Sequence, residues 1–212
     1  MSTSRDDILA RIRSVESTPA EPFVRAYHRA GTATAHERVL RFCERVSDYR
    51  AVVKRVCRAE VGAEVTAVLE GLVVERIGVP PDLPTAWRPT GVEVVDDNGL
   101  STSALDQLDG VITGCTVGVA ETGTIILAGA ATEGRRALTL VPDIHLCVVL
   151  EDQIVETVPE ALDRINDLAT RQHRPITLVS GPSATSDIEL SRVEGVHGPR
   201  TLVVLVVSEE AS

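Results

Sequence analysis

The chain has 212 residues, of which 43% are hydrophobic and 25% are charged, and these are ordinary values for one globular domain. Acidic residues outnumber basic ones by 31 to 21, so the formal net charge is −10, and aromatic residues make up only 2% of the chain. This composition argues against nucleic-acid binding, because a net acidic chain lacks a footprint for the phosphate backbone and offers few aromatic faces for stacking. No run of about 18 apolar residues is present, so we expect no membrane span, and the N-terminus lacks the apolar core of a signal peptide.

The four cysteines do not have the spacing of a metal site. Cys43, Cys57, Cys115 and Cys147 form no C-x-x-C pair, and no cluster of cysteine and histidine has zinc or iron–sulfur spacing. We therefore expect no metal ligands and no cofactor in this chain, and reduced cysteines in a cytoplasmic protein.

Residues 1–48 are predicted to form a helical arm of basic character. A first helix is expected around Ile8 and Ile12, and a second one begins near Thr34. Residues 1–60 carry 12 basic and 8 acidic residues, so the rest of the chain is strongly acidic. The arm either presents a solvated basic face or binds an acidic partner or a second copy of the chain, which would make a homo-oligomer.

Residues 49–212 are predicted to form an α/β domain in which strands alternate with helices. Strands are expected at 51–56, 76–79, 91–95, 145–150, 175–179 and 201–207, two more around a turn at 121–123 within 110–128, and helices at 59–72, 101–108 and 158–171. Continuous apolar runs at 147–150 and 202–207 are typical of strands buried on both faces. We therefore expect a sheet with helices on both faces.

The common signatures of cofactor and hydrolase sites are absent. The sequence contains no G-x-G-x-x-G, no G-x-x-x-x-G-K-[ST] and no G-x-S-x-G, and its single lysine, Lys54, falls in a predicted strand. Dinucleotide, P-loop, nucleophile-elbow and Schiff-base chemistry are therefore not indicated.

Two polar, glycine-containing segments in the middle of the chain are candidates for a site. Glu121 could act as a general base or nucleophile if burial tunes its pKa, and Gly123 permits a positive φ between the hydroxyls of Thr122 and Thr124. Further along, Arg135 and Arg136 could bind an anion. The alternatives are an exposed hairpin turn in the first segment and loop arginines that balance the acidic region in the second.

A third segment follows the predicted strand at 175–179. Its candidate ligand-binding residues are Gly181, Ser183, Thr185 and Glu189, and Asp187 could orient His197 in an acid–base pair. Ligands bind at the carboxyl ends of strands in open α/β sheets, which favours a site here. The alternative is local turn chemistry, in which these side chains cap their own backbone.

Taken together, these motifs resemble those of the LUD-domain family, and most closely the LutC (YkgG-like) lactate-utilization proteins. The motifs AETGT at 120–124, GR at 134–135, LVPDIH at 140–145, GPS-x-T-x-DIE at 181–189 and GVHGP at 195–199 occur in the family's order. The resemblance covers residues 50–207 and implies a fold like that of the NagB/RpiA/CoA-transferase proteins. Many relatives have arginine at the position of Ala184, and Arg135 or Arg136 could compensate for its loss.

The resemblance implies an accessory role in the oxidation of L-lactate to pyruvate, together with two iron–sulfur partner proteins that supply the redox centres. It also implies a small carboxylate as a possible ligand. The sequence does not decide whether the chain is itself an enzyme. The alternative is a free-standing enzyme of the CoA-transferase or sugar-phosphate-isomerase superfamily that acts on a small anion through Glu121, with Arg135 and Arg136 as the anion clamp.

Overall fold

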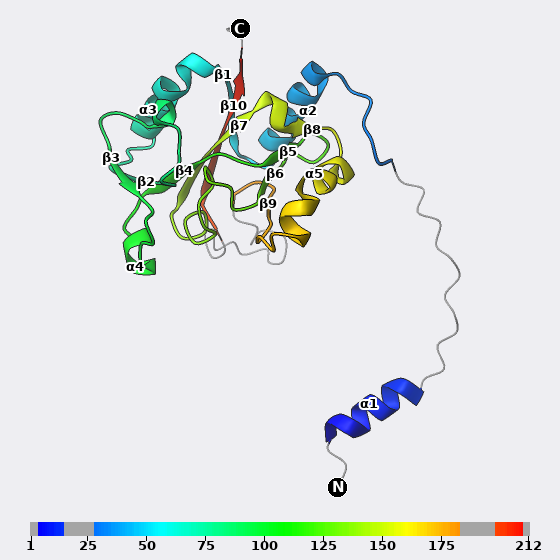
Figure 1. Ribbon diagram of the computed structural model, residues 1–212. Coiled ribbons are helices and arrows are strands. Elements are labelled where there is room, and N and C mark those ends of the chain that lie inside the picture. The colour runs from blue at the N-terminus through cyan, green and yellow to red at the C-terminus, as the bar shows by residue number, and fades with distance from the viewer. Residues whose placement is uncertain (1–3, 15–27, 183–197, 210–212) are drawn as a thin grey trace.

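A six-stranded parallel sheet lies at the centre of the molecule (Figure 1). The computed structural model describes residues 4–14, 28–182 and 198–209. The strand order is β1-β10-β7-β4-β2-β3, and every neighbouring pair is parallel. The strands are β1 (Val52–Cys57), β10 (Thr201–Ser208), β7 (Ile144–Leu150), β4 (Gly110–Thr113), β2 (Arg76–Val79) and β3 (Glu93–Asp96).

The two inner strands β7 and β10 are buried on both faces, as their apolar runs predict. Leu202, Val204 and Val206 of β10 pack into one core cluster, whereas the alternate residues 203, 205 and 207 pack into another. This separation follows from the geometry of a strand, in which successive side chains point to opposite faces of the sheet. The strands therefore require apolar cover on each side.

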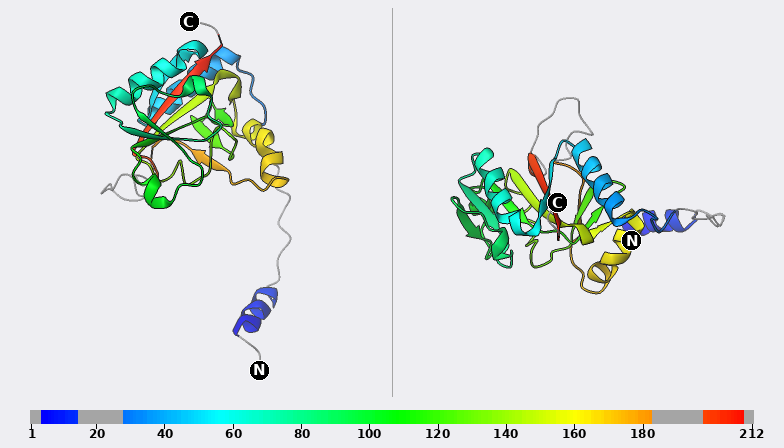
Figure 2. Two further views of the ribbon diagram at one scale, coloured as in Figure 1. Left: turned by 60° about the vertical axis from the view of Figure 1, so that its left-hand side comes forward. Right: turned by 90° about the horizontal axis from the view of Figure 1, so that it is seen from above.

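Helices cover the two faces, and Figure 2 shows α2 and α3 on opposite sides of β10. On one face, α3 (Val61–Gly71) buries Val61, Val65 and Leu69, and Trp87 of the short helix η2 (Thr85–Trp87) packs beside them. On the other face, α2 (Ala35–Asp48) buries Phe42 among strand residues. The predicted α/β class, a sheet with helices on both faces, is confirmed, and the structure adds that this sheet is parallel. The 3-10 turns η1 (Arg58–Glu60) and η3 (Glu151–Gln153) and the short helix α4 (Thr102–Leu105) complete the connections.

A second sheet, which the sequence did not predict, shares the α2 face of the large sheet. Its order is β8-β5-β6-β9, and its strands are β8 (Ile154–Val155), β5 (Val117–Val119), β6 (Thr124–Leu127) and β9 (Thr177–Val179). Helix α5 (Val158–Thr170) covers its other side with Ala161 and Ile165. The hairpin around 121–123 is confirmed, but the expectation of two strands in 110–128 was wrong, because β4 precedes the hairpin and belongs to the large sheet.

The N-terminal part of the chain contributes two helices of different character. Helix α1 (Ser4–Ser14) has no buried residue, whereas α2 buries Val39, Phe42 and Val46 in the core beneath the second sheet. Thr34 caps α2 in a capping box with Glu37, as its sequence position suggested. The division of the chain at residues 48 and 49 stays a prediction, but α2 is packed into the α/β body. Among the helices in the described part of the chain, none combines the length and the apolar character that a membrane span requires.

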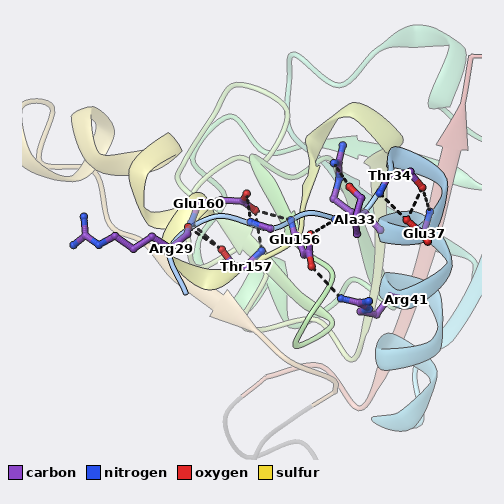
Figure 3. A network of polar contacts seen from close by, with 10 residues as sticks. Arg29, Ala33, Thr34, Glu37, Arg41, Glu156, Thr157 and Glu160 are labelled. Atoms are coloured by element: carbon purple, nitrogen blue, oxygen red, sulfur yellow. Dashed lines mark hydrogen bonds and ion pairs between the residues drawn. The ribbon is translucent and has the colours of Figure 1, made fainter. Parts of the chain in front are cut away.

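The segment that leads into α2 is held by two carboxylates near the start of α5 (Figure 3). The backbone N–H of Gly31 donates to Glu160 Oε1 at 2.9 Å, and that of Ala33 donates to Glu156 Oε2 at 2.6 Å. Glu156 also pairs with Arg41 of α2 at 3.3 Å. Burial alone would raise the pKa of Glu160, but hydrogen bonds from the N–H groups of residues 31, 156 and 157 lower it below its ordinary value. These hydrogen bonds and the ion pair with Arg41 therefore fix α2 against the second sheet.

Gly123 in the β5–β6 turn is required by both its backbone conformation and its surroundings. Its φ is +63°, and a Cβ atom there would lie 2.7 Å from the backbone of Arg45 and Val46 in α2. Gly129 has the same φ of +63° but no atom within 4 Å of such a Cβ. We predict that Gly129→Ala lowers the free energy of unfolding by about 1–2 kcal/mol, from the left-handed conformation alone. Gly123→Ala should lower it by a further ~1–3 kcal/mol because of overpacking.

Urea unfolding of the two variants beside the parent protein measures this difference. Equal losses of the free energy of unfolding in the two alanine variants would show that α2 does not restrict the space at Gly123.

Candidate functional site

Two cavities adjoin one another, and the first of them lies beside the amino ends of β7 and β10. The first, which we call the His145 cavity, has a volume of about 330 Å³, and its polar and apolar walls include Tyr49, Arg136, Thr139, His145, Ser180, Gly181, Pro182, Gly198 and Leu202. The second, which we call the Glu133 cavity, has a volume of about 470 Å³ and is lined by Asp82, Glu133, Gly134 and Arg135, among others. Arg136, Thr139 and Thr177 line both cavities and so form their shared wall.

His145 is a buried, uncharged histidine in the wall of the first cavity. It is 1% exposed, and its Nε2 lies 2.8 Å from Thr113 Oγ1 on the neighbouring strand β4. Burial lowers its pKa to about 4, and the positive charge of Arg136 contributes to the shift. At neutral pH the ring can therefore accept or donate a hydrogen bond but carries no charge.

Arg136 is the charged side chain at the boundary of the two cavities. Its Nη1 donates to Thr139 Oγ1 at 3.1 Å and to the Thr139 carbonyl oxygen at 3.4 Å. No carboxylate among the described residues lies within ion-pair distance of its guanidinium group. The sequence prediction that Arg136 could bind an anion is therefore compatible with its surroundings.

Arg135 lies beside Arg136 in the sequence but has a structural partner. Its Nε and Nη2 donate to the two oxygens of Asp97 at 2.8 and 2.9 Å. Burial alone would raise the pKa of Asp97, but the hydrogen bonds from Arg135 and from the Leu100 and Gly99 N–H groups lower it. The charge of Arg135 is thus compensated, and the pair fixes the loop after β6 to the loop after β3.

Glu133 lines the second cavity and stabilises the loop around it, a role that the sequence analysis did not assign. It is 1% exposed and accepts hydrogen bonds from Thr116 Oγ1 at 2.6 Å and from the backbone N–H groups of Ala128 and Ala130 at 2.7 and 2.9 Å. A buried carboxylate with three donors stabilises the loop that carries Arg135 and Arg136. No sequence pattern identifies these donors, since two of them are main-chain groups.

The turn that carries Glu121 lies next to the His145 cavity, but Glu121 does not line it. The Glu121 side chain is exposed at the tip of the β5–β6 hairpin. Thr122 Oγ1 lies 2.7 Å from Thr124 Oγ1, which lies 2.8 Å from Ser180 Oγ in the cavity wall. A row of hydroxyls therefore connects the turn with the cavity, while Glu121 has the position of an exposed hairpin residue.

The third predicted segment is described only at its two ends. Gly181 has a φ of +90° and packs on Tyr49, which lies just after α2. Gly181 and Pro182 on one side, and Gly198 and Pro199 on the other, line the His145 cavity. Ser183, Ala184, Thr185, Asp187, Glu189 and His197 lie outside the described residues, so the predicted pairing of Asp187 with His197 stays a prediction. The strand before this segment, β9, belongs to the second sheet, so the rule for ligands in open parallel sheets does not apply to it.

Metal-ligating side chains do not cluster in the part of the chain that is described. Within residues 4–14, 28–182 and 198–209, no three histidine, cysteine, aspartate or glutamate side chains are arranged to hold a metal ion. Cys115 and Cys147 are buried free thiols, and a hydrogen bond with Cys147 together with burial raises the pKa of Cys115 well above its ordinary value. The protonated thiol is the poorer metal ligand.

Comparison with known proteins gives this arrangement a family. Residues 92–207 match the LUD domain. The chain belongs to the LUD-domain family. Over 78% of its length it is 49% identical to Lactate utilization protein C of Deinococcus radiodurans, covering 77% of that protein. It is also 28% identical, over 82% of its length, to the uncharacterized protein YkgG of Escherichia coli, of which it covers 77%.

A solved structure has the same fold. The crystal structure of a duf162 family protein from Deinococcus radiodurans matches with a TM-score of 0.74 and 41% identity, over 84% of this chain and 100% of that one. The LUD match begins just before β3 and ends within β10. It therefore includes the described walls of the His145 cavity apart from Tyr49, which the segment after α2 supplies.

The buried state of His145 predicts a specific acid sensitivity. Its pKa is lowered from 6.5 to about 4, so between these values the unfolded chain binds a proton that the folded chain does not. Stability should therefore fall as the pH decreases through this window, by up to about 3 kcal/mol from this residue. The free energy of unfolding measured by urea titration between pH 7 and pH 4 tests this, with His145→Gln as the comparison. An unchanged pH slope in the variant would assign the acid sensitivity to other groups.

The ion pair between Arg135 and Asp97 should contribute more to stability than an exposed ion pair does. The Asp97 side chain is 2% exposed, so Asp97→Asn should lower the free energy of unfolding by about 1–3 kcal/mol through lost charged hydrogen bonds. The control Asp143→Asn removes an exposed pair with Arg200 at 3.5 Å and should change stability by less than about 1 kcal/mol. Thermal and urea unfolding of both variants measure the difference, and a similar loss in both would contradict a structural role for Arg135.

Proposed function

We propose that this LUD-domain protein is an accessory component of a system that oxidises L-lactate to pyruvate and that partner proteins hold the iron–sulfur clusters of that system. The observation that carries the proposal is its 49% identity to Lactate utilization protein C over more than three quarters of both chains. Its own contribution is to bind a small carboxylate, or a segment of a partner, at the two cavities.

The chemistry of lactate oxidation and the distribution of the cysteines support an electron acceptor that resides in partner proteins. Oxidation of a 2-hydroxy acid to a 2-oxo acid removes two electrons and two protons, so it requires a redox centre. Cys115 and Cys147 are buried and Cys43 and Cys57 are half-buried on different elements, α2 and β1. Together with the lack of cluster-type spacing in the sequence, this distribution supports cofactors that reside in the partners. Free thiols also suit a reducing, cytoplasmic location.

The free-standing-enzyme alternative gains no specific observation from the described residues. It needs Glu121 in a buried setting and both arginines available to an anion. Glu121 is instead exposed at a turn, and Arg135 is paired with Asp97. Arg136 fits both functions equally.

Purification of the tagged chain from its native host tests the proposal. With cells grown on L-lactate, and without oxygen at low salt, we expect iron–sulfur proteins to co-purify in stoichiometric amounts and to give the eluate their visible absorption. Cells grown on another carbon source provide the control for adventitious partners.

A host strain that lacks the gene gives an independent measurement. Growth on L-lactate should be lost and should return with the parent chain. A colourless, solitary protein combined with normal growth of the deletion strain on L-lactate would overturn the proposal.

A further inference from the structure

We infer that the His145 cavity binds a small monocarboxylate whose carboxylate pairs with Arg136 and whose neighbouring polar atom hydrogen-bonds to His145 or Thr139. The choice of 2-hydroxy and 2-oxo acids as the first ligands rests on the proposed function. The preference for a singly charged carboxylate rests on the charges and dimensions of the cavity alone.

The balance of charge in the two cavities favours a monoanion. Arg136 contributes one positive charge, which Thr139 orients and no described carboxylate neutralises. His145 contributes none at neutral pH, and the charge of Arg135 is compensated by Asp97. On the far side of Arg136, Glu133 and Asp82 line the second cavity. One guanidinium group matches the single charge of a monocarboxylate, whereas a phosphate dianion would keep one uncompensated negative charge beside a cavity that also contains two carboxylates.

The geometry of the wall supplies the remaining features of a small-acid site. A guanidinium group binds a carboxylate with two parallel hydrogen bonds, and Nη1 of Arg136 is already positioned by Thr139. Thr139 and His145 are both buried, whereas Arg136 is exposed, so a bound acid would reach from an exposed guanidinium group to two buried polar side chains. Tyr49, Val179 and Leu202 provide apolar contact for a short carbon chain. A volume of about 330 Å³ is at the lower end of the range of about 300–1,000 Å³ for small-molecule sites, which fits a small acid rather than a nucleotide.

Isothermal titration of the full chain with sodium L-lactate, pyruvate, acetate and inorganic phosphate tests the inference. We expect lactate and pyruvate to bind at millimolar concentrations or better, acetate more weakly because it lacks the hydroxyl or oxo oxygen on carbon 2, and phosphate at least about tenfold more weakly than lactate. Tighter binding of phosphate than of any carboxylate would overturn the class of ligand. Absence of binding by every carboxylate would overturn the site.

The variant Arg136→Gln locates the binding. It should raise the dissociation constant for lactate about tenfold or more, because a charged hydrogen-bond pair is lost. The matched control is Arg171→Gln, which makes the same change on an exposed side chain of the α5 end that is bonded to Asp167 at 3.5 Å and lines neither cavity. The control should leave the constant within about twofold. Equal effects of the two substitutions would overturn the role of Arg136.

A second variant serves if Arg136→Gln does not fold, as judged by circular dichroism. Arg136→Lys keeps the charge but loses the paired donors, so it should weaken lactate binding by an intermediate, several-fold amount. Unchanged binding by the lysine variant would show that the carboxylate does not pair with the guanidinium group.

The outcome is separable from that of the proposed function. Carboxylate binding is measured on the isolated chain, whereas the lactate system is tested by co-purification and growth. If the chain binds a carboxylate but no iron–sulfur partner, the inferred site stands and the proposed accessory role is overturned. If it binds the partners but no carboxylate, the accessory role stands and the inferred site is overturned.

Discussion

The burial of β7 and β10 on both faces is the constraint on which the rest of the structure depends. Residues 145–149 and 202–207 are all buried, so neither face of these strands can remain in water. Each 100 Å² of apolar surface left exposed would reduce the free energy of unfolding by about 2.5 kcal/mol, and the apolar residues of both strands present such surface on both faces. Helix α3 covers one face, and the other face is covered jointly by α2 and the second sheet. The His145 cavity lies where this composite cover meets the amino ends of the two strands.

The polar side chains of His145 and Thr113, on the neighbouring strands β7 and β4, are buried and have hydrogen-bond partners. His145 contributes its polar ring to the wall of the His145 cavity. His145 and Thr113 come from adjacent parallel strands whose register places Val111 opposite His145. Their contact gives both buried polar groups a partner, and burial keeps the imidazole neutral by lowering its pKa. The adjacent arginines differ, because Asp97 compensates Arg135, whereas Arg136 donates to Thr139 and pairs with no carboxylate among the described residues. The result is a small, partly apolar space with a single uncompensated cation in the described wall.

Close approach between distant segments maintains this arrangement. Glu156 and Glu160 accept backbone N–H groups from the segment before α2, and Gly123 lets the β5–β6 turn contact the backbone of the same helix. Tyr49 follows α2 directly and packs on Gly181, so the placement of the helix decides one wall of the His145 cavity. The segment before α2, the hairpin and the strand β9 therefore jointly position the wall of the His145 cavity, although more than 120 residues separate the first from the last. In this LUD-domain protein the candidate site is formed by the elements that cover the sheet.

The sequence by itself determined the α/β class, most strand and helix positions, the family and the three segments that bear polar side chains. These follow from local periodicity, from capping residues such as Thr34 and from motif order, all of which are written along the chain. Tertiary structure alone decided that 110–127 divides between two sheets, that Arg135 pairs with Asp97 while no described carboxylate pairs with Arg136, and that His145 is uncharged. Strand partners, buried hydrogen-bond donors and the local dielectric come from residues far apart in sequence, such as Asp97 with Arg135 and Thr113 with His145. Sequence spacing does not predict these contacts, because each one becomes favourable only when the folded core has excluded water from it.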